Sequence, residues 1–259
     1  MNSLINKNYI IFYIFIGLAL HLMSAYWSYG FYSDDEHFQI LEPVAYLLGL
    51  NNIIIEDVSG YYWEWRLHIR MRPWLQPYFY YNLITLFKYI GISDPFSWTL
   101  TIRILSSLFG FFSIIYLFFT IKKDFIFKDT HFTYFFFFSF WFYPFIHSRT
   151  SSENLSITLF LISFCMIYKQ IKLDNFKTNY FIYFISSFIL GLSMVVKFNM
   201  VFTVIPILIW ITIFKFNIFK IILFCSSVLL ALSFGLFIDF INWGSFTNTY
   251  LQFYEHNLG

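Results

Sequence analysis

The chain has 259 residues, of which 59% are hydrophobic, 26% are aromatic and only 12% are charged. Soluble globular domains carry about 25% charged residues, so this composition excludes an ordinary soluble domain and indicates a membrane protein. The formal net charge of +2 gives no basic face of the kind that binds nucleic acid, and no nucleic-acid partner is expected.

The first long apolar run covers residues 9–29, roughly the ~20 residues that cross a bilayer as a helix. Further apolar runs follow it, so it is interpreted as a retained membrane helix rather than a cleaved signal peptide. Directly after it stand Asp34, Asp35 and Glu36. Neighbouring carboxylates repel one another, and such a cluster is best tolerated where it binds a ligand or where one member acts as a base. A solvated loop without chemistry is the alternative.

Residues 30–97 form a long loop that is rich in aromatic side chains. Residues 38–49 alternate apolar and polar positions at helical spacing and end at Gly49, which predicts a helix lying along the membrane interface. Trp63 and Trp65 have the character of an aromatic belt that anchors the chain. Anchoring does not explain Glu64 and Arg66 between and beside these rings.

The apolar runs predict about seven membrane spans. They lie at residues 9–29, 98–121, 131–147, 153–170, 180–196, 199–216 and 219–241. Lysines cluster in alternate connections, which the positive-inside rule assigns to the cytoplasm together with the N-terminus. Residues 30–97 and the segment from about 242 are then external or lumenal. Every arginine falls on that external side or at its boundary, at Arg66, Arg70, Arg72, Arg103 and Arg149.

Several motifs, taken in order, resemble glycosyltransferase family 22 of the GT-C superfamily. The resemblance rests on Asp35-Glu36-His37-Phe38-Gln39, Trp63-Glu64-Trp65, Arg70-Met71-Arg72-Pro73, Ser148-Arg149-Thr150 with Glu153, and Asp239 with Trp243-Gly244. It covers nearly the whole chain. Ser33-Asp34 stand where the family has His-Pro, so the role of that histidine is absent here or has moved to His37.

The resemblance implies an all-α polytopic membrane protein, a GT-C-like transmembrane helix bundle whose long first external loop carries interfacial helices. Residues 1–259 would form a single such domain, lacking the C-terminal helices of the family. The implied activity is transfer of a hexose, mannose in this family, from a polyprenyl-phosphate sugar donor to a glycan or glycolipid acceptor. Membrane lipids surround the protein, in a bacterial plasma membrane or an endoplasmic reticulum.

Inverting transfer requires a base that removes the proton of the acceptor hydroxyl. Asp35 is our candidate base, and Glu36 or Asp34 would orient the acceptor or share a proton. Negative charge builds on the departing phosphate, which arginine stabilises well. Substrate-binding candidates are Glu64, Arg66, Arg70, Arg72, Arg149, Glu153 and Asp239. Lys197 is a further possible clamp, although snorkelling explains Lys197 and Arg103 equally well. A structural partnership with Arg149 is the alternative for Asp239.

No cofactor or metal is expected. His37, His68, His147 and His256 match no zinc-binding spacing, and Cys165 and Cys225 lie inside apolar runs as small hydrophobes. Three other functions remain open at this point. They are a GT-C transferase of the lipid-A aminoarabinose or protein O-mannosyl type, a polytopic transporter, and an inactive membrane subunit.

Overall fold

The computed structural model describes residues 2–28, 36–50, 63–66, 69–122, 124, 130–172, 179–214 and 217–258. Within these residues every regular element is helical, which confirms the all-α prediction. The longer helices are α1 (Asn2–Trp27), α5 (Leu75–Tyr89), α6 (Pro95–Ile121), α9 (Ser152–Lys172), α10 (Tyr180–Val196), α11 (Val201–Phe214) and α12 (Ile218–Trp243). The shorter elements are η1 (His37–Leu41), α3 (Glu42–Leu47), η2 (Trp63–Trp65), α7 (Thr130–Tyr134), η3 (Phe135–Ser139), α8 (Phe142–His147), η5 (Phe198–Met200) and α13 (Thr249–Leu258).

Helices α1, α6, α9 and α12 are long and apolar enough to cross a membrane, and α10 and α11 are shorter apolar helices. Large side chains such as Phe15, Phe181 and Phe202 are more than two-thirds exposed on these helices. Such surfaces suit contact with lipid rather than water. The protein is therefore a helical, polytopic membrane protein, and seven crossings stay a prediction.

Residues 131–147, predicted as one span, form three pieces, α7, η3 and α8. Phe140 between η3 and α8 has an extended backbone, with φ −67° and ψ 123°. Pro144 lies four residues later, and a proline ring clashes with the carbonyl of the fourth preceding residue in a continuous helix. The proline accounts for the break.

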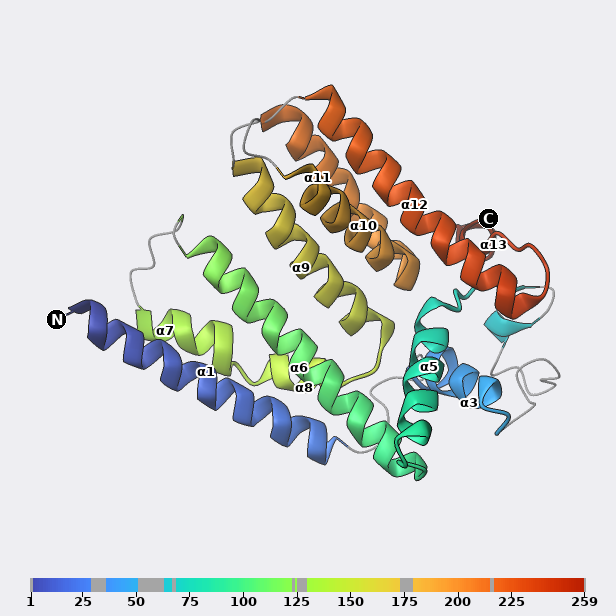
Figure 1. The fold of residues 1–259 in the computed structure, drawn as a ribbon, viewed down its shortest axis with the longest axis horizontal. Coiled ribbons are helices and arrows are strands. Elements are labelled where there is room, and N and C mark those ends of the chain that lie inside the picture. The colour runs from blue at the N-terminus through green and yellow to red at the C-terminus, as the bar shows by residue number, and fades with distance from the viewer. Residues whose placement is uncertain are drawn as a thin grey trace.

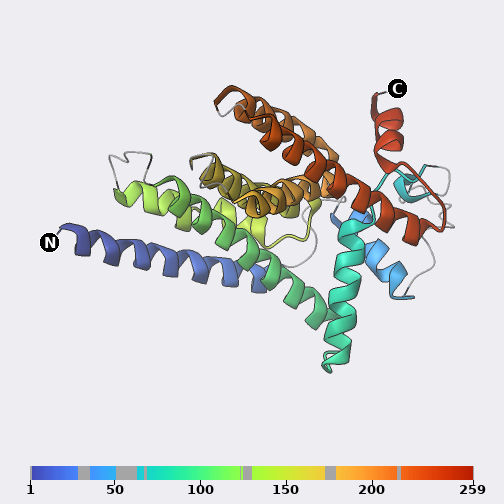
Figure 2. The ribbon, with the colours of Figure 1, turned by 45° about the horizontal axis from the view of Figure 1, so that its top comes forward.

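The helices form two groups that meet along α6 and α9 (Figure 1). The first contains α1, α6, α7 and α8, and the second contains α9, α10, α11 and α12 (Figures 1 and 2). Helices α3, α5 and α13 gather at one end of the bundle, here called the α5 end. The C-terminal ends of α6, α9 and α11 lie at the opposite end (Figure 1).

Close packing holds the helices together. A Cβ atom on Gly17 would lie 2.1 Å from the carbonyl oxygen of Phe138, so only glycine lets α1 approach η3 this closely. Tyr183, Leu190 and Phe224 are buried where α10 meets α12. Lipid offers no hydrophobic force between membrane helices, so such contacts carry much of their association.

The α5 end has its own aromatic core. The Trp65 and Trp74 rings are 4.5 Å apart, and Trp74 lies 5.3 Å from Trp243 at the end of α12. Helix α3 is followed by Gly49 at φ +71°, which confirms the predicted helix end. Helix α5 was not predicted from the sequence. It begins after Trp74 and crosses one end of the bundle, where it contacts α6, α10 and α12 (Figure 2).

Candidate functional site

Glu36, the last member of the acidic cluster, is fixed beneath the surface. Its side chain is 1% exposed, and Oε1 accepts hydrogen bonds from the Thr150 amide (2.8 Å) and the Thr150 hydroxyl (2.7 Å). Thr150 lies in the buried link between α8 and α9. These bonds tie the start of the first loop to that link. Asp34 and Asp35 lie outside the described residues.

Gln76 of α5 reaches the same link from the other side. Its Nε2 donates to the Thr150 carbonyl oxygen at 2.8 Å and lies 3.4 Å from the Tyr80 hydroxyl. Gln76 and Tyr80 are both buried, one turn apart on α5. Burial raises the pKa of Tyr80 to about 12; the hydrogen bond from Gln76 lowers this pKa in part, and the charge of Glu36 adds a smaller increase. Tyr80 is therefore a neutral hydroxyl at any physiological pH.

Two arginines stand beside Glu36. Arg103 of α6 lies close enough to Glu36 and to Arg149 to experience the charge of each. Arg149 precedes Thr150, is 8% exposed, and places its guanidinium carbon 5.1 Å from the Phe145 ring. Two guanidinium groups and one carboxylate therefore lie in the same part of the site. Such a site suits a phosphate-bearing ligand.

Polar side chains of α6 and α9 also bind the link between α8 and α9. Asn154 Nδ2 donates to the carbonyl oxygens of His147 (3.1 Å) and Arg149 (2.8 Å), and the Ser106 hydroxyl donates to the Arg149 carbonyl at 3.0 Å. His147 in turn contacts His21 of α1, with Nδ1 and Nε2 3.0 Å apart. The backbone that carries Arg149 and Thr150 is thus fixed by α1, α6 and α9.

The loop arginines form a second group. Arg72 forms a bidentate ion pair with Glu64: its Nε donates to Oε2 at 2.9 Å, and a terminal nitrogen donates to Oε1 at 2.5 Å. Arg70 has a left-handed backbone (φ 47°), donates to Ser245 and to Thr247 (3.1 Å), and lies over the Trp243 ring. These contacts join the loop to the connection between α12 and α13. Arg66 is half-buried beside them.

The last two predicted residues have protein partners. Glu153 accepts a hydrogen bond from Lys197 Nζ at 2.5 Å, which links α9 to the residue that follows α10. Asp239 is fully buried, and its two oxygens accept from the Trp74 amide (2.7 Å) and the Thr249 hydroxyl (2.8 Å). Asp239 therefore joins α12, α5 and α13. Its structural partners are these two groups rather than the Arg149 considered from sequence.

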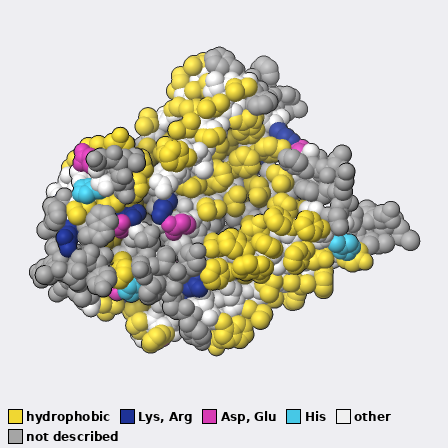
Figure 3. Space-filling view, turned by 180° about the vertical axis from the view of Figure 1, so that it is seen from behind, with side chains coloured by type: hydrophobic (Ala, Val, Ile, Leu, Met, Phe, Trp, Pro, Cys, Tyr) yellow, Lys and Arg dark blue, Asp and Glu magenta, His cyan; other side chains and the backbone are white. Residues whose placement is uncertain are grey.

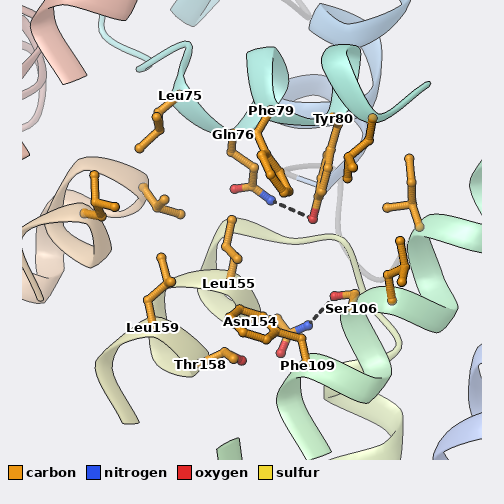
Figure 4. Close-up of a pocket in the computed structure, with 15 residues that line it drawn as sticks. Leu75, Gln76, Phe79, Tyr80, Ser106, Phe109, Asn154, Leu155, Thr158 and Leu159 are labelled. Carbon is orange, nitrogen blue, oxygen red and sulfur yellow. Dashed lines mark hydrogen bonds between the residues drawn. The ribbon is translucent and has the colours of Figure 1, made fainter. Parts of the chain in front are cut away.

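A cavity of about 460 Å³ opens between α5, α6, α9 and α10 (Figure 4). Gln76 and Tyr80 point into it from α5, and Ser106 and Asn154 lie across from them. Its other walls are formed mainly by leucine and phenylalanine. Seen from behind, charged side chains gather over the α5 end while apolar side chains cover the bundle (Figure 3). The cavity is thus bordered by the polar side chains of Gln76, Tyr80, Ser106 and Asn154 and by apolar side chains of the same helices.

Among the described residues, no group of three or more His, Cys, Asp or Glu side chains is arranged to hold a metal ion. His37 lies instead 3.1 Å from Glu42. His68 lies outside the described residues. That no metal is required stays a prediction.

Comparison with known proteins identifies the chain. The model of the Alg9-like mannosyltransferase family matches residues 10–259. The chain belongs to this family. It is a membrane mannosyltransferase, which uses a sugar donor and a glycan acceptor. No curated protein and no solved structure matches it.

Several residues at the candidate site were not predicted from the sequence. Gln76, Tyr80, Ser106 and Asn154 are single polar residues in aromatic or apolar stretches. The one available signal was Thr150, which belongs to the quoted Ser-Arg-Thr motif. Arg103 was noted from sequence, but its proximity to Glu36 depends on helix packing that no local pattern reveals.

Proposed function

We propose that the protein transfers mannose from a polyprenyl-phosphate sugar to a lipid-linked glycan or glycolipid, with inversion, on the external or lumenal face. The observation that carries this proposal is the cluster of Glu36, Arg103 and Arg149, which lies beside an apolar cavity. In the sequence, Glu36 directly follows Asp34 and Asp35. A lipid phosphate needs cations for its head and apolar surface for its chain.

In this reaction the acceptor hydroxyl oxygen attacks the anomeric carbon as the bond from that carbon to the phosphate oxygen breaks. The bonding electrons pass to the phosphate, and the hydroxyl proton passes to a carboxylate. Arg149 and Arg103 would stabilise the charge that grows on the phosphate. Family membership favours this transferase function over the transporter and the inactive subunit considered from sequence.

Asp35 remains the proposed base. Glu36 Oε1 accepts two hydrogen bonds from Thr150. A base would have to exchange such bonds for a proton in each turnover, so Glu36 is better suited to hold the acidic cluster in position. Asp34 and Glu36 would then orient the acceptor. The second group, with Arg66, Arg70, Arg72 and Glu64, would border the acceptor sugar at the α5 end, and Glu153 would support the site through Lys197.

The test uses the full chain in proteoliposomes with radiolabelled polyprenyl-phosphate mannose and membrane glycolipid extract as acceptor. We expect Asp35→Asn to slow transfer by about 10²–10⁴-fold, the usual cost of losing a general base, with donor binding unchanged. Asp34→Asn, the matched control, should be milder. Normal transfer by Asp35→Asn would overturn the assignment of the base. Consumption of a nucleotide sugar in place of the lipid-phosphate sugar would overturn the donor class.

A further inference from the structure

Helix α5 is too short to cross the membrane, yet it carries a continuous apolar surface. With about 3.6 residues per turn, its side chains fall on three faces. One face is buried and includes Gln76, Tyr80, Ile84 and Phe87. The next carries polar and tyrosine side chains, Tyr78, Tyr81, Asn82, Thr85, Lys88 and Tyr89. The third face, here called the open stripe, is entirely apolar and consists of Leu75, Phe79, Leu83, Leu86 and Ile90.

The packing of α5 sets its depth in the membrane. Helix α6 contains 27 residues and is about 40 Å long, whereas the hydrocarbon core of a bilayer is about 30 Å thick. Lys122 follows α6 directly and marks one boundary of the core, so the first two turns of α6 lie at the other boundary. Ile84 and Phe87 of α5 pack with Trp98 and Ile102 in those turns. Helix α5 therefore lies at the level where the hydrocarbon core meets the headgroups.

The direction of α5 is that of a helix on the membrane surface. It runs across the direction of α1 rather than along it (Figure 2). A helix in this position buries its apolar side among the acyl chains and leaves its polar side toward water. Leu75, Phe79 and Leu83 of the open stripe line the cavity that α5 shares with α6 and α9. The open stripe is therefore on the side of α5 that faces the spanning helices and the bilayer.

The open stripe also continues a surface that faces lipid. Leu105 and Phe109 of α6 line the same cavity and are exposed. Leu86 and Ile90 extend the apolar surface beyond the cavity, and each is more than half exposed. Two helices that run in different directions thus share one apolar surface. Such a surface is unfavourable in water, whereas acyl chains cover it without cost.

The preceding helix of the same loop offers no such surface. Among the described residues of η1 and α3, no large apolar side chain is exposed. Helix α3 packs against α5 instead. Of these two helices, α5 is the one suited to contact the membrane.

We propose that α5 is a membrane-contact helix that lies in the leaflet at the α5 end, with its open stripe against the acyl chains and its tyrosine-bearing face toward the headgroups and water. The partner is the bilayer itself, and the match is one of apolar surface and depth. The cavity between α5, α6 and α9 then borders lipid rather than water. This inference requires only that the protein spans the membrane, and it does not depend on the donor or acceptor proposed above.

The test places single spin labels on α5 in the full chain, reconstituted in phosphatidylcholine nanodiscs. Leu86→Cys and Ile90→Cys report on the open stripe, and Asn82→Cys and Thr85→Cys are matched exposed positions on the adjacent face. Collisions of each label with oxygen, which concentrates among acyl chains, are compared with collisions with a water-soluble nickel chelate. We expect the oxygen-to-nickel ratio to be at least about threefold higher at the two stripe positions. The natural chain, labelled in parallel, corrects for its own cysteines.

All four substituted side chains are exposed, so none of the substitutions removes core packing. An equal ratio at all four positions would overturn the proposal, because the open stripe would then share the surroundings of the polar face. Low collision rates with both reagents at Leu86 and Ile90 would mean that protein covers the stripe, and would also overturn it. Dipolar broadening between labels would identify that protein as a second copy of the chain. None of these measurements involves mannose transfer, so the proposed function stands or fails on its own assay.

Discussion

Replacing Asp239 by alanine is expected to destabilise the α5 end, whereas replacement by asparagine is expected to be tolerated. Asp239 is fully buried and accepts from the Trp74 amide and the Thr249 hydroxyl. Alanine leaves both donors buried without an acceptor. Each unpaired group costs about 1–3 kcal/mol, so the variant should lose about 2–6 kcal/mol.

Asparagine preserves the geometry without the charge. Its Oδ1 can still accept from the Trp74 amide, and its Nδ2 can donate to the Thr249 oxygen once that hydroxyl rotates, because a hydroxyl both donates and accepts. The expected loss is about 1 kcal/mol, the size of one ordinary hydrogen bond. Activity should therefore follow stability, with Asp239→Asn close to the natural protein.

The assay is thermal unfolding in detergent, followed by tryptophan fluorescence, since Trp74 and Trp243 lie beside the substituted residue. Mannosyl transfer is measured on the same preparations. Glu255→Ala, an exposed carboxylate on α13, serves as the control. If Asp239→Asn unfolds at the natural temperature but loses transfer more than about 100-fold, its charge acts on substrate, as the sequence suggested, and the structural reasoning is wrong.

Three further predictions follow from contacts at the site. Arg149→Lys keeps the charge but loses the planar guanidinium, so the KM for the polyprenyl-phosphate donor should rise with little change in unfolding temperature. An unchanged KM would mean that another cation binds the donor phosphate. Gly110→Ala places a Cβ 2.4 Å from the His147 ring, so it should lower stability by about 1–3 kcal/mol, seen as a lower unfolding temperature. Burial raises the folded-state pKa of Tyr80 to about 12, above its unfolded value, so its contribution to stability is complete below about pH 10 and is lost as pH rises toward 12. Tyr80→Phe should accordingly lose less stability over that alkaline range, and identical alkaline unfolding curves would contradict the burial.

The sequence was sufficient for features set by local composition. Hydropathy identified the apolar helices, and the helical spacing before Gly49 predicted the helix that the structure confirms at α3. Helix α5 was not predicted, because its cluster of tyrosine and phenylalanine, with Pro77 in the first turn, is also typical of an interfacial loop. The break at Phe140 was readable in principle from Pro144, but the uninterrupted run of phenylalanine concealed it.

The candidate site was predicted only in part, because its geometry depends on long-range packing. The sequence marked Glu36 and Arg149, and the structure brings them together with Arg103 through the link between α8 and α9. The sequence did not distinguish Arg103 and Arg149 from Arg70 and Arg72, which form a separate group. Arg70 binds the connection after α12, and Arg72 binds Glu64. Residues 34 and 35 lie outside the described residues, so the assignment of the base still rests on the sequence.

The contact between His21 and His147 selects one tautomer of each ring and one register of α1. His21 Nδ1 lies 2.7 Å from the Gly17 carbonyl oxygen, which can only accept, so that nitrogen must carry a proton. In a neutral ring the opposite nitrogen, Nε2, then has a lone pair, and His147 Nδ1 must donate to it. One tautomer of each ring is thereby selected. If α1 slipped by a single turn, both imidazoles would lose this partner inside the protein, so the pair fixes the register of α1 against the backbone that carries Arg149.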